Sequence, residues 1–312
     1  MFRLNDLILL LVIFGSILVG VLLPCIGAPF QPFVLYLMML LLFLSFLTIK
    51  MDTIYLTLKN AVGTIALLAV VKTIVLPTGV YFLFKAMCPS YALAALLLSG
   101  ISTGVVAPFI SNVVKANSPL VLVMVVITSL LAPFTLPAII KILLARSVDI
   151  PLLAMIRTLC LVVFVPIFAV ETLRRVKPSV IGGIMKRQFP LSLGIISIIN
   201  LGVFSQYADF FYQRPATILT ALLVAVVLSG IYLLAGILFL LPGSIENQMA
   251  GAISFGNMNN VLIIVFASQF FGPLEPTVAA MYQFPFFGLI LPLKLYRSWR
   301  QACRHHGTQA ID

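Results

Sequence analysis

Residues 91–114 read YALAALLLSGISTGVVAPFISNVV, and residues 248–271 read QMAGAISFGNMNNVLIIVFASQFF. Each stretch is long enough to cross a bilayer, yet polar and helix-breaking residues interrupt its middle. The tetrapeptide at 101–104 (ISTG) matches the one at 253–256 (ISFG), about half the chain length further on. Interrupted spans at corresponding places in two halves predict an internal repeat and point to the binding site of a secondary transporter.

The composition around these stretches is that of a membrane protein. The chain is 62% hydrophobic and 9% charged, with a mean hydropathy of +1.21. A soluble domain carries about a quarter charged residues. Apolar runs predict ten spans, near 7–23, 32–49, 61–84, 91–114, 118–144, 151–173, 190–206, 216–241, 248–271 and 277–296. We expect an all-α integral membrane protein with two five-helix halves, inverted relative to each other because five is odd.

The spans and the charges predict a domain plan and an orientation. Residues 1–173 hold the first six spans, 174–189 form a cytoplasmic linker, 190–296 hold the last four spans, and 297–312 form a basic tail. Lysine and arginine concentrate on one side of these spans, which places both termini in the cytoplasm of a bacterial inner or plasma membrane. The net charge of +11 therefore needs no nucleic-acid partner. The lipid bilayer is the expected contact of the tail, and the oligomeric state is left open.

Cysteine and histidine offer no catalytic or metal-binding pattern. Cys25 and Cys88 both fall at predicted outer loops, so a disulfide is conceivable, but free buried thiols are the favoured interpretation. Neither a metal cluster nor a nucleophile–base pair can be assembled from the sequence. We therefore expect no enzyme activity, no metal and no cofactor.

The interrupted spans supply the candidate binding site. Unwound backbone in a membrane must face a cavity, an ion or a substrate, and the half-helix after a break presents a positive dipole end suited to an anion. Breaks are predicted at Gly100, Pro108 and Gly256. The predicted substrate-binding residues are Ser102, Thr103, Gly104, Asn257, Asn259 and Asn260, with Ser111, Asn112 and Ser254 as further polar lining. The alternative is that these small residues only allow close helix packing.

Lys72 lies at the centre of the predicted span 61–84. A lysine near a helix end can reach the interface, but this one is about 16 Å deep by the helical rise. An ionisable residue at this depth indicates a functional site. The alternative is a structural lysine whose donors are satisfied by backbone carbonyls alone.

Several stretches resemble the bile acid/sodium symporter superfamily. Residues 104–137, with 115–120 (KANSPL), 129–133 (SLLAP) and Leu136-Pro137, are similar to its fourth and fifth helices, and Gly256 with its polar followers to its ninth. Lys72, five residues before Pro77, fits its third-helix pattern. The resemblance implies a panel domain of spans 1, 2, 6 and 7, and a core of spans 3–5 and 8–10 whose broken fourth and ninth helices cross.

The sodium ligands that this resemblance implies are missing. Aligned without gaps, the ligand positions of the fourth and fifth helices fall on Ala107, Pro108, Val121 and Val125. The glutamate of the ninth helix falls on Ser254, and the glutamine of the third on Lys72. A dehydrated sodium ion would therefore meet an ammonium group. Two unit charges 4 Å apart repel by about 4 kcal/mol at an effective dielectric near 20, so sodium is possible but doubted.

The sequence thus predicts an alternating-access transporter of a small organic anion, carboxylated or sulfonated. Lys72 is expected to replace a bound cation, to carry a proton, or to pair with the substrate. Three rivals remain: a sodium symporter that uses backbone carbonyls and the asparagines, an efflux carrier related to the auxin type, and a receptor that binds an anion without moving it.

Overall fold

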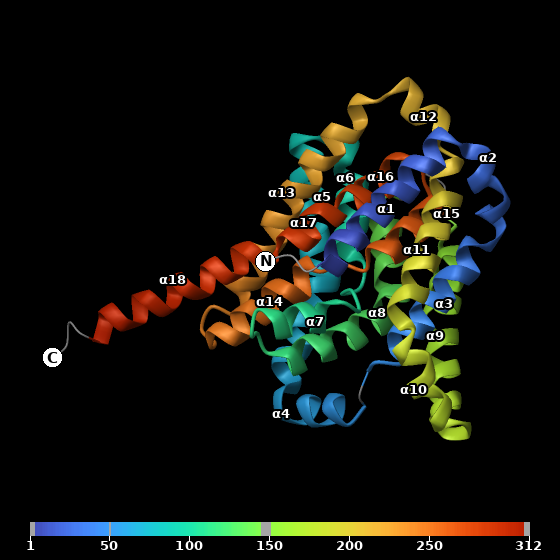
Figure 1. Cartoon of the computed structure of the whole chain (residues 1–312). Coiled ribbons are helices and arrows are strands. Elements are labelled where there is room, and N and C mark those ends of the chain that lie inside the picture. The colour runs from blue at the N-terminus through green and yellow to red at the C-terminus, as the bar shows by residue number, and fades with distance from the viewer. Residues whose placement is uncertain (1–3, 50, 145–150, 309–312) are drawn as a thin grey trace.

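The computed structural model describes residues 4–49, 51–144 and 151–308, and these are helical except for short connections and one isolated β-bridge (Figure 1). The helices of the first half are α1 (Leu4–Leu22), α2 (Pro24–Gly27), η1 (Ala28–Phe33), α3 (Val34–Phe46), α4 (Met51–Val70), η2 (Val71–Val75), α5 (Leu76–Met87), η3 (Pro89–Tyr91), α6 (Ala92–Gly100), α7 (Ala107–Val113) and α8 (Ser118–Leu144). Those of the second half are α9 (Leu152–Val176), α10 (Pro178–Lys186), α11 (Gln188–Ser205), α12 (Ala208–Gln213), α13 (Ala216–Phe239), α14 (Ile245–Gly256), α15 (Asn260–Phe270), α16 (Leu274–Met281), α17 (Gln283–Gly288) and α18 (Ile290–Thr308).

Seven helical stretches of the described chain are long and apolar enough to cross a membrane. They are Pro24–Phe46, Thr53–Met87, Ser118–Leu144, Leu152–Val176, Gln188–Ser205, Ala216–Phe239 and Leu274–Gln301. The other three predicted spans correspond to shorter apolar helices of the described residues, Leu11–Leu22, Pro89–Gly100 and Asn260–Phe270, and the last two of these are halves of broken spans. The fold is therefore all-helical and membrane-embedded, whereas ten spans in inverted halves stay a prediction.

The predicted cytoplasmic linker at 174–189 is largely helical, and so is the described part of the predicted basic tail, residues 297–308. α9 continues to Val176, and Pro178 begins α10 at a first-turn position where its missing N–H costs nothing. Arg174 donates to the carbonyls of Phe46, Leu47 and Ile49 at the end of α3, so this segment packs on the bundle. The predicted tail begins inside α18, which starts at Ile290. Arg297 of this helix donates to the Val114 and Lys115 carbonyls.

The two cysteines considered for a disulfide are both free. Cys25 and Cys88 are exposed on the surface of the bundle. The prediction of free thiols is confirmed, and the prediction that they are buried is wrong.

The helices pack in two groups. One group contains α1, α3, α9 and α11, in which α11 packs on α1 and α3, and α3 packs on α9. The other contains α4 to α8 and α13 to α16, in which α13 packs on α14, α5 on α6 and α15 on α16. The packing of α9 on α8 and contacts of α15 with α3 and α11 join the groups, and α18 projects away from the bundle (Figure 1). The broken helices therefore belong to one group and face the other.

The closest helix approach in the second group is between α13 and α14. A Cβ atom at Gly236 would lie 2.4 Å from the carbonyl oxygen of Gly251, and one at Gly251 would lie 2.4 Å from that of Gly236. Paired glycines allow such contact between helices in a membrane, where dispersion forces replace the hydrophobic effect as the driving force. This contact fixes α14, which leads directly into the second break.

Gly236→Ala is expected to lower the free energy of unfolding by about 1–3 kcal/mol, because the added methyl must push two backbones apart. Gly230→Ala is the matched control, since it lies on the same helix with nothing within 4 Å of the added Cβ. That variant should be neutral or gain up to ~1 kcal/mol of helix propensity. Thermal unfolding of both purified proteins tests this, and equal melting temperatures would contradict the close packing.

Candidate functional site

Two broken helices cross in the middle of the protein. Residues 101–106 separate α6 from α7, and residues 257–259 separate α14 from α15. The two breaks pair as a short antiparallel bridge, in which the Gly104 N–H donates to the Asn257 carbonyl (2.6 Å) and the Asn259 N–H to the Ser102 carbonyl (3.0 Å). Each break thereby satisfies backbone groups of the other, which a membrane interior could not do.

The tetrapeptide match that indicated the repeat is out of register with the structure. Residues 253–256 form the last turn of α14, whereas residues 101–104 already lie beyond the end of α6. By their helix ends, Gly100 corresponds to Gly256, which shifts the match by about one helical turn. The broken helices correspond to each other, but the individual residues of the tetrapeptides do not.

Gly104 and Thr103 hold the crossing together. A Cβ atom at Gly104 would lie 2.7 Å from the Met258 carbonyl oxygen, so only glycine permits this approach. The Thr103 hydroxyl donates to the Ser254 carbonyl at 2.7 Å, and the Thr103 N–H donates to the Thr128 hydroxyl at 2.9 Å. Gly104 therefore allows the two backbones to meet, and the Thr103 side chain links the first break to α14.

Lys72 lies against the end of the first half-helix. Its ammonium donates to the Ser99 carbonyl at 2.7 Å and lies 2.9 Å from the sulfur of Met258, and the side chain is 0% exposed. The carbonyls of the last helical turn lack intrahelical partners and carry the negative end of the helix dipole. Lys72 thus supplies a positive charge where α6 offers unpaired carbonyls, and no carboxylate of the described residues contacts it.

A π-helical turn positions Lys72. Residues Val71–Val75 form η2 between α4 and α5, directly before Pro77. Proline lacks the N–H that would continue the α-helical ladder, and single π-turns of this kind are frequent at functional sites. The extra residue in the turn directs Lys72 inward to the crossing.

Tyr282 performs the corresponding task at the second half-helix. Its hydroxyl donates to the Gly256 carbonyl at 2.7 Å, at the end of α14, and the side chain is buried. The two half-helix ends are therefore capped by different chemistry, a cation on α6 and a neutral hydroxyl on α14. Sequence reasoning did not identify Tyr282, because a tyrosine near a span end is common in membrane proteins.

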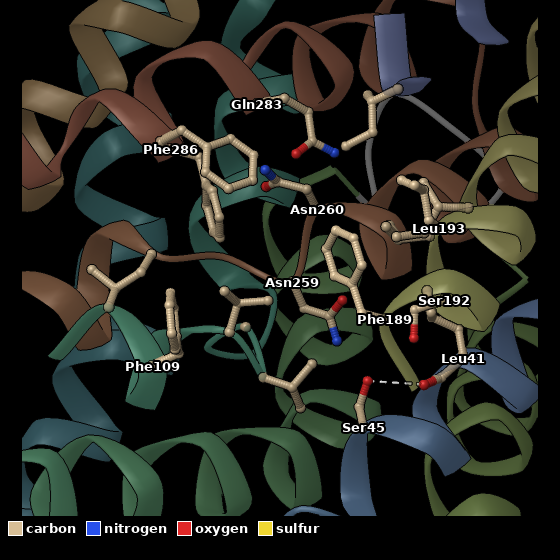
Figure 2. A pocket seen from close by; sticks show the side chains of 18 of the residues that line it. Leu41, Ser45, Phe109, Phe189, Ser192, Leu193, Asn259, Asn260, Gln283 and Phe286 are labelled. Carbon is tan, nitrogen blue, oxygen red and sulfur yellow. Dashed lines mark hydrogen bonds between the residues drawn. The ribbon is translucent and has the colours of Figure 1, made fainter. Parts of the chain in front are cut away.

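A cavity of about 800 Å³ lies beside the crossing, between the two helix groups (Figure 2). Gly104, Asn259 and Asn260 line it from the breaks. Among the other lining residues are Leu41 and Ser45 of α3, Phe109 of α7, Phe189, Ser192 and Leu193 of α11, and Gln283 and Phe286 of α17. Phenylalanines from three helices make most of this wall apolar, and the amides supply its polar groups.

The structure divides the predicted binding residues into two sets. Gly104, Asn259 and Asn260 line the cavity, whereas Ser102, Thr103 and Asn257 are buried behind it and do not line it. The Ser102 hydroxyl and both amide atoms of Asn257 have no hydrogen-bond partner, and the same holds for Asn260. Asn260 is therefore a buried amide at the wall of the cavity with both polar atoms available.

The remaining predicted residues shape the breaks. Pro108 lies in the first turn of α7, and Gly100 and Gly256 end the preceding half-helices. Ser111 donates to the Pro108 carbonyl, and Asn112 accepts from Ser118, so both lie in α7 and Asn112 ties it to the start of α8. Ser254 lies buried in α14 with its hydroxyl unpartnered.

Sequence reasoning also missed the cavity residues Gln283, Phe109, Phe189 and Phe286. Gln283 is 5% exposed inside an apolar stretch, and a polar residue at that depth is a signal that could have found it. The phenylalanines give no such signal, because the chain contains 24 of them.

The other end of the cavity is closed by contacts between the two groups. The Tyr207 hydroxyl, after α11, donates to the Ser268 carbonyl of α15 at 3.2 Å. Burial, with a smaller contribution from the Glu275 carboxylate, raises the pKa of Tyr207 to about 12. The hydroxyl therefore keeps its proton at neutral pH and remains a donor.

A helical membrane bundle whose two broken helices cross beside a cavity has the architecture of a secondary transporter. A sequence model of the SBF-like CPA transporter family matches residues 7–276. The chain belongs to this family, and its resemblance to the bile acid/sodium symporter superfamily is confirmed. A search of curated proteins gave no match. The family is one of membrane transporters, which agrees with the expectation of a protein that is not an enzyme.

Thr103→Val should lower the free energy of unfolding by about 1–3 kcal/mol, because the Ser254 carbonyl loses its buried donor while the side-chain shape is kept. Thr78→Val is the matched control, since the Thr78 hydroxyl donates to the Ile74 carbonyl at an exposed site. That variant should change the melting temperature little. Comparable losses in both would show that Thr103 contributes nothing special at the crossing.

Proposed function

We propose that this protein is a secondary transporter that moves a small organic anion by alternating access, and that Lys72 takes the place of a bound sodium ion. The observation that carries the proposal is the Lys72 ammonium 2.7 Å from the Ser99 carbonyl at the end of α6. A cation at this point stabilises the negative end of a half-helix, as a bound metal ion would. The side-chain positions Ala107, Val121 and Val125, where sodium ligands would be expected, are apolar and fully buried.

The charges around the cavity support an anionic substrate. Lys186 and Lys294 line it, and both are exposed. Among the described residues that line it, none is acidic. The N-terminus of α15 adds the positive end of a helix dipole, and Asn260 offers a free amide there. A carboxylate or sulfonate would be held at this end, and the phenylalanines would contact an apolar body.

The two groups of helices support alternating access. We take α1, α3, α9 and α11 as a panel and the other transmembrane helices as a core, with ten spans in two inverted halves. The cavity lies between them and is lined by Lys186 and Lys294, which the distribution of basic residues assigns to the cytoplasmic side. On this assignment both termini are cytoplasmic, the structure faces inward, and rocking of the core against the panel would open the other side.

Sodium symport is the second candidate, because three polar side chains at the crossing have no partner. The hydroxyls of Ser102 and Ser254 and the amide of Asn257 are buried and unsatisfied. Oxygen ligands of this kind suit a hard cation. The repulsion from Lys72, about 4 kcal/mol at 4 Å, argues against an ion close to it.

Thermal stability in sodium and potassium chloride decides between the two candidates. The wild-type melting temperature should be the same in both salts, because the cation place is filled. Lys72→Gln should melt at a lower temperature in potassium and recover in part in sodium, since a ligand stabilises the state that binds it.

A sodium-specific gain in the wild-type protein would overturn the cation replacement and favour symport. Lys85→Gln is the control for loss of a lysine from the same span, because Lys85 lies in the last turn of α5 away from the crossing. That variant should show no difference between the salts.

Transport itself is tested with proteoliposomes and a panel of radiolabelled carboxylates and sulfonates. We expect uptake of at least one member in sodium-free potassium chloride by vesicles preloaded with the same unlabelled anion, and about tenfold less in Lys294→Glu, because a negative charge at the cavity repels the anion. Lys177→Glu is the control, since Lys177 is basic but does not line the cavity. A receptor would bind a member of the panel without moving it, and an enzyme would convert it.

A further inference from the structure

The charge at the crossing is covalently attached to the protein. Lys72 reaches the end of α6 from a different helix and is fully buried. A coupling ion drives a carrier because it binds on one side of the membrane and leaves on the other, and a ligand shifts an equilibrium only through such differential binding. A side chain cannot leave. No metal-ion gradient can therefore be coupled by release at this position, and the positive charge stays in both orientations while the ammonium keeps its proton.

The empty site also contains polar groups that have no hydrogen-bond partner or counter-charge. Both amide atoms of Asn260 are unsatisfied at the wall of the cavity, next to the N-terminus of α15. Two further cations, Lys186 and Lys294, line the same space. While the cavity faces the aqueous phase, water reaches Lys186 and Lys294, which are exposed, but not the amide atoms of Asn260, which are already buried. During reorientation the cavity must close, and water then no longer compensates the two cations either.

An anion removes both obstacles at once. Its negative charge offsets Lys72 and the dipole of α15, and its oxygens accept from the Asn260 amide. The loaded carrier can close with an anion beside its cations, whereas the empty one must close with Lys72 balanced only by the end of α6 and with Lys186 and Lys294 stripped of water. This difference between the loaded and the empty carrier favours reorientation of the loaded one.

From this electrostatic difference we infer that the protein is an obligate exchanger, in which an organic anion must occupy the cavity for each passage between inward-facing and outward-facing states. The inference rests on the proposed function, and it adds the mode of transport. Net uptake without a counter-anion on the other side would not occur, and the ratio of two anion gradients would drive the flux.

The test uses the empty protein, so it needs no identified substrate. Ile196 lines the cavity at the middle of α11, where a side chain is reachable from either side as the cavity alternates. Ile196→Cys is made in a background with Cys25, Cys88, Cys160 and Cys303 changed to serine. A membrane-impermeant maleimide is applied to right-side-out and to inverted vesicles, washed in potassium chloride buffered with Tris.

With Lys72 present, we expect labelling at least tenfold faster from one face than from the other. With Lys72→Gln, the rates from the two faces should agree within about threefold, because the charge that opposes closure of the empty site is gone. Lys72→Met serves as a second neutral variant, and size-exclusion profiles establish that each protein is folded. Restored Cys88 is the orientation control, since it is exposed and should label from one face in every variant.

Two results would overturn the inference. Equal labelling from both faces with Lys72 present would show that the empty carrier reorients, as in a uniporter. One-sided labelling in the neutral variants as well would show that another feature holds the empty carrier. Either result leaves the proposed function standing, because that depends on the separate comparison of sodium with potassium.

Discussion

The rest of the structure depends on the backbone pairing between the two breaks. An interrupted helix in a membrane exposes N–H and C=O groups that lipid cannot satisfy. Here each break is the partner of the other, through Gly104 with Asn257 and Asn259 with Ser102. Neither irregular segment would be stable alone, so the two half-helix pairs form one unit. The pairing also sets where α15 begins, and hence where its N-terminus meets the cavity.

The pairing of the breaks does not satisfy the free carbonyls at the ends of the half-helices, and two different side chains do so. α14 ends at a carbonyl that takes a hydrogen bond from Tyr282, and α6 ends at one that takes a charged hydrogen bond from Lys72. A hydroxyl only satisfies an acceptor, whereas an ammonium also opposes the dipole of the helix. The two ends therefore differ in electrostatics although both are buried.

Hydropathy and helix breakers predicted the class of fold and the breaks at Gly100 and Gly256, since these depend on local sequence. The sequence could not predict which groups meet at the crossing. The alignment of residues 101–104 with 253–256 differs by about one helical turn from the correspondence of the helix ends. The place where each helix ends depends on its contacts with the other broken helix and not on its own residues alone. Asn257 and Asn260 read alike in sequence, yet only Asn260 lines the cavity.

Lys72 lies close enough to the cavity for its charge to act on two things. It stabilises the end of α6, and it would attract an anion in the cavity. Met258 contacts the Lys72 ammonium and also lines the cavity, so a single side chain separates the cation from the space for a substrate. A polarizable thioether transmits the field of the ammonium without pairing with it. An anion in the cavity would therefore feel the charge of Lys72, while the ammonium keeps its bond to Ser99. A carboxylate at Met258 would pair with Lys72 and cancel that field, which is a physical reason for a sulfur at this position.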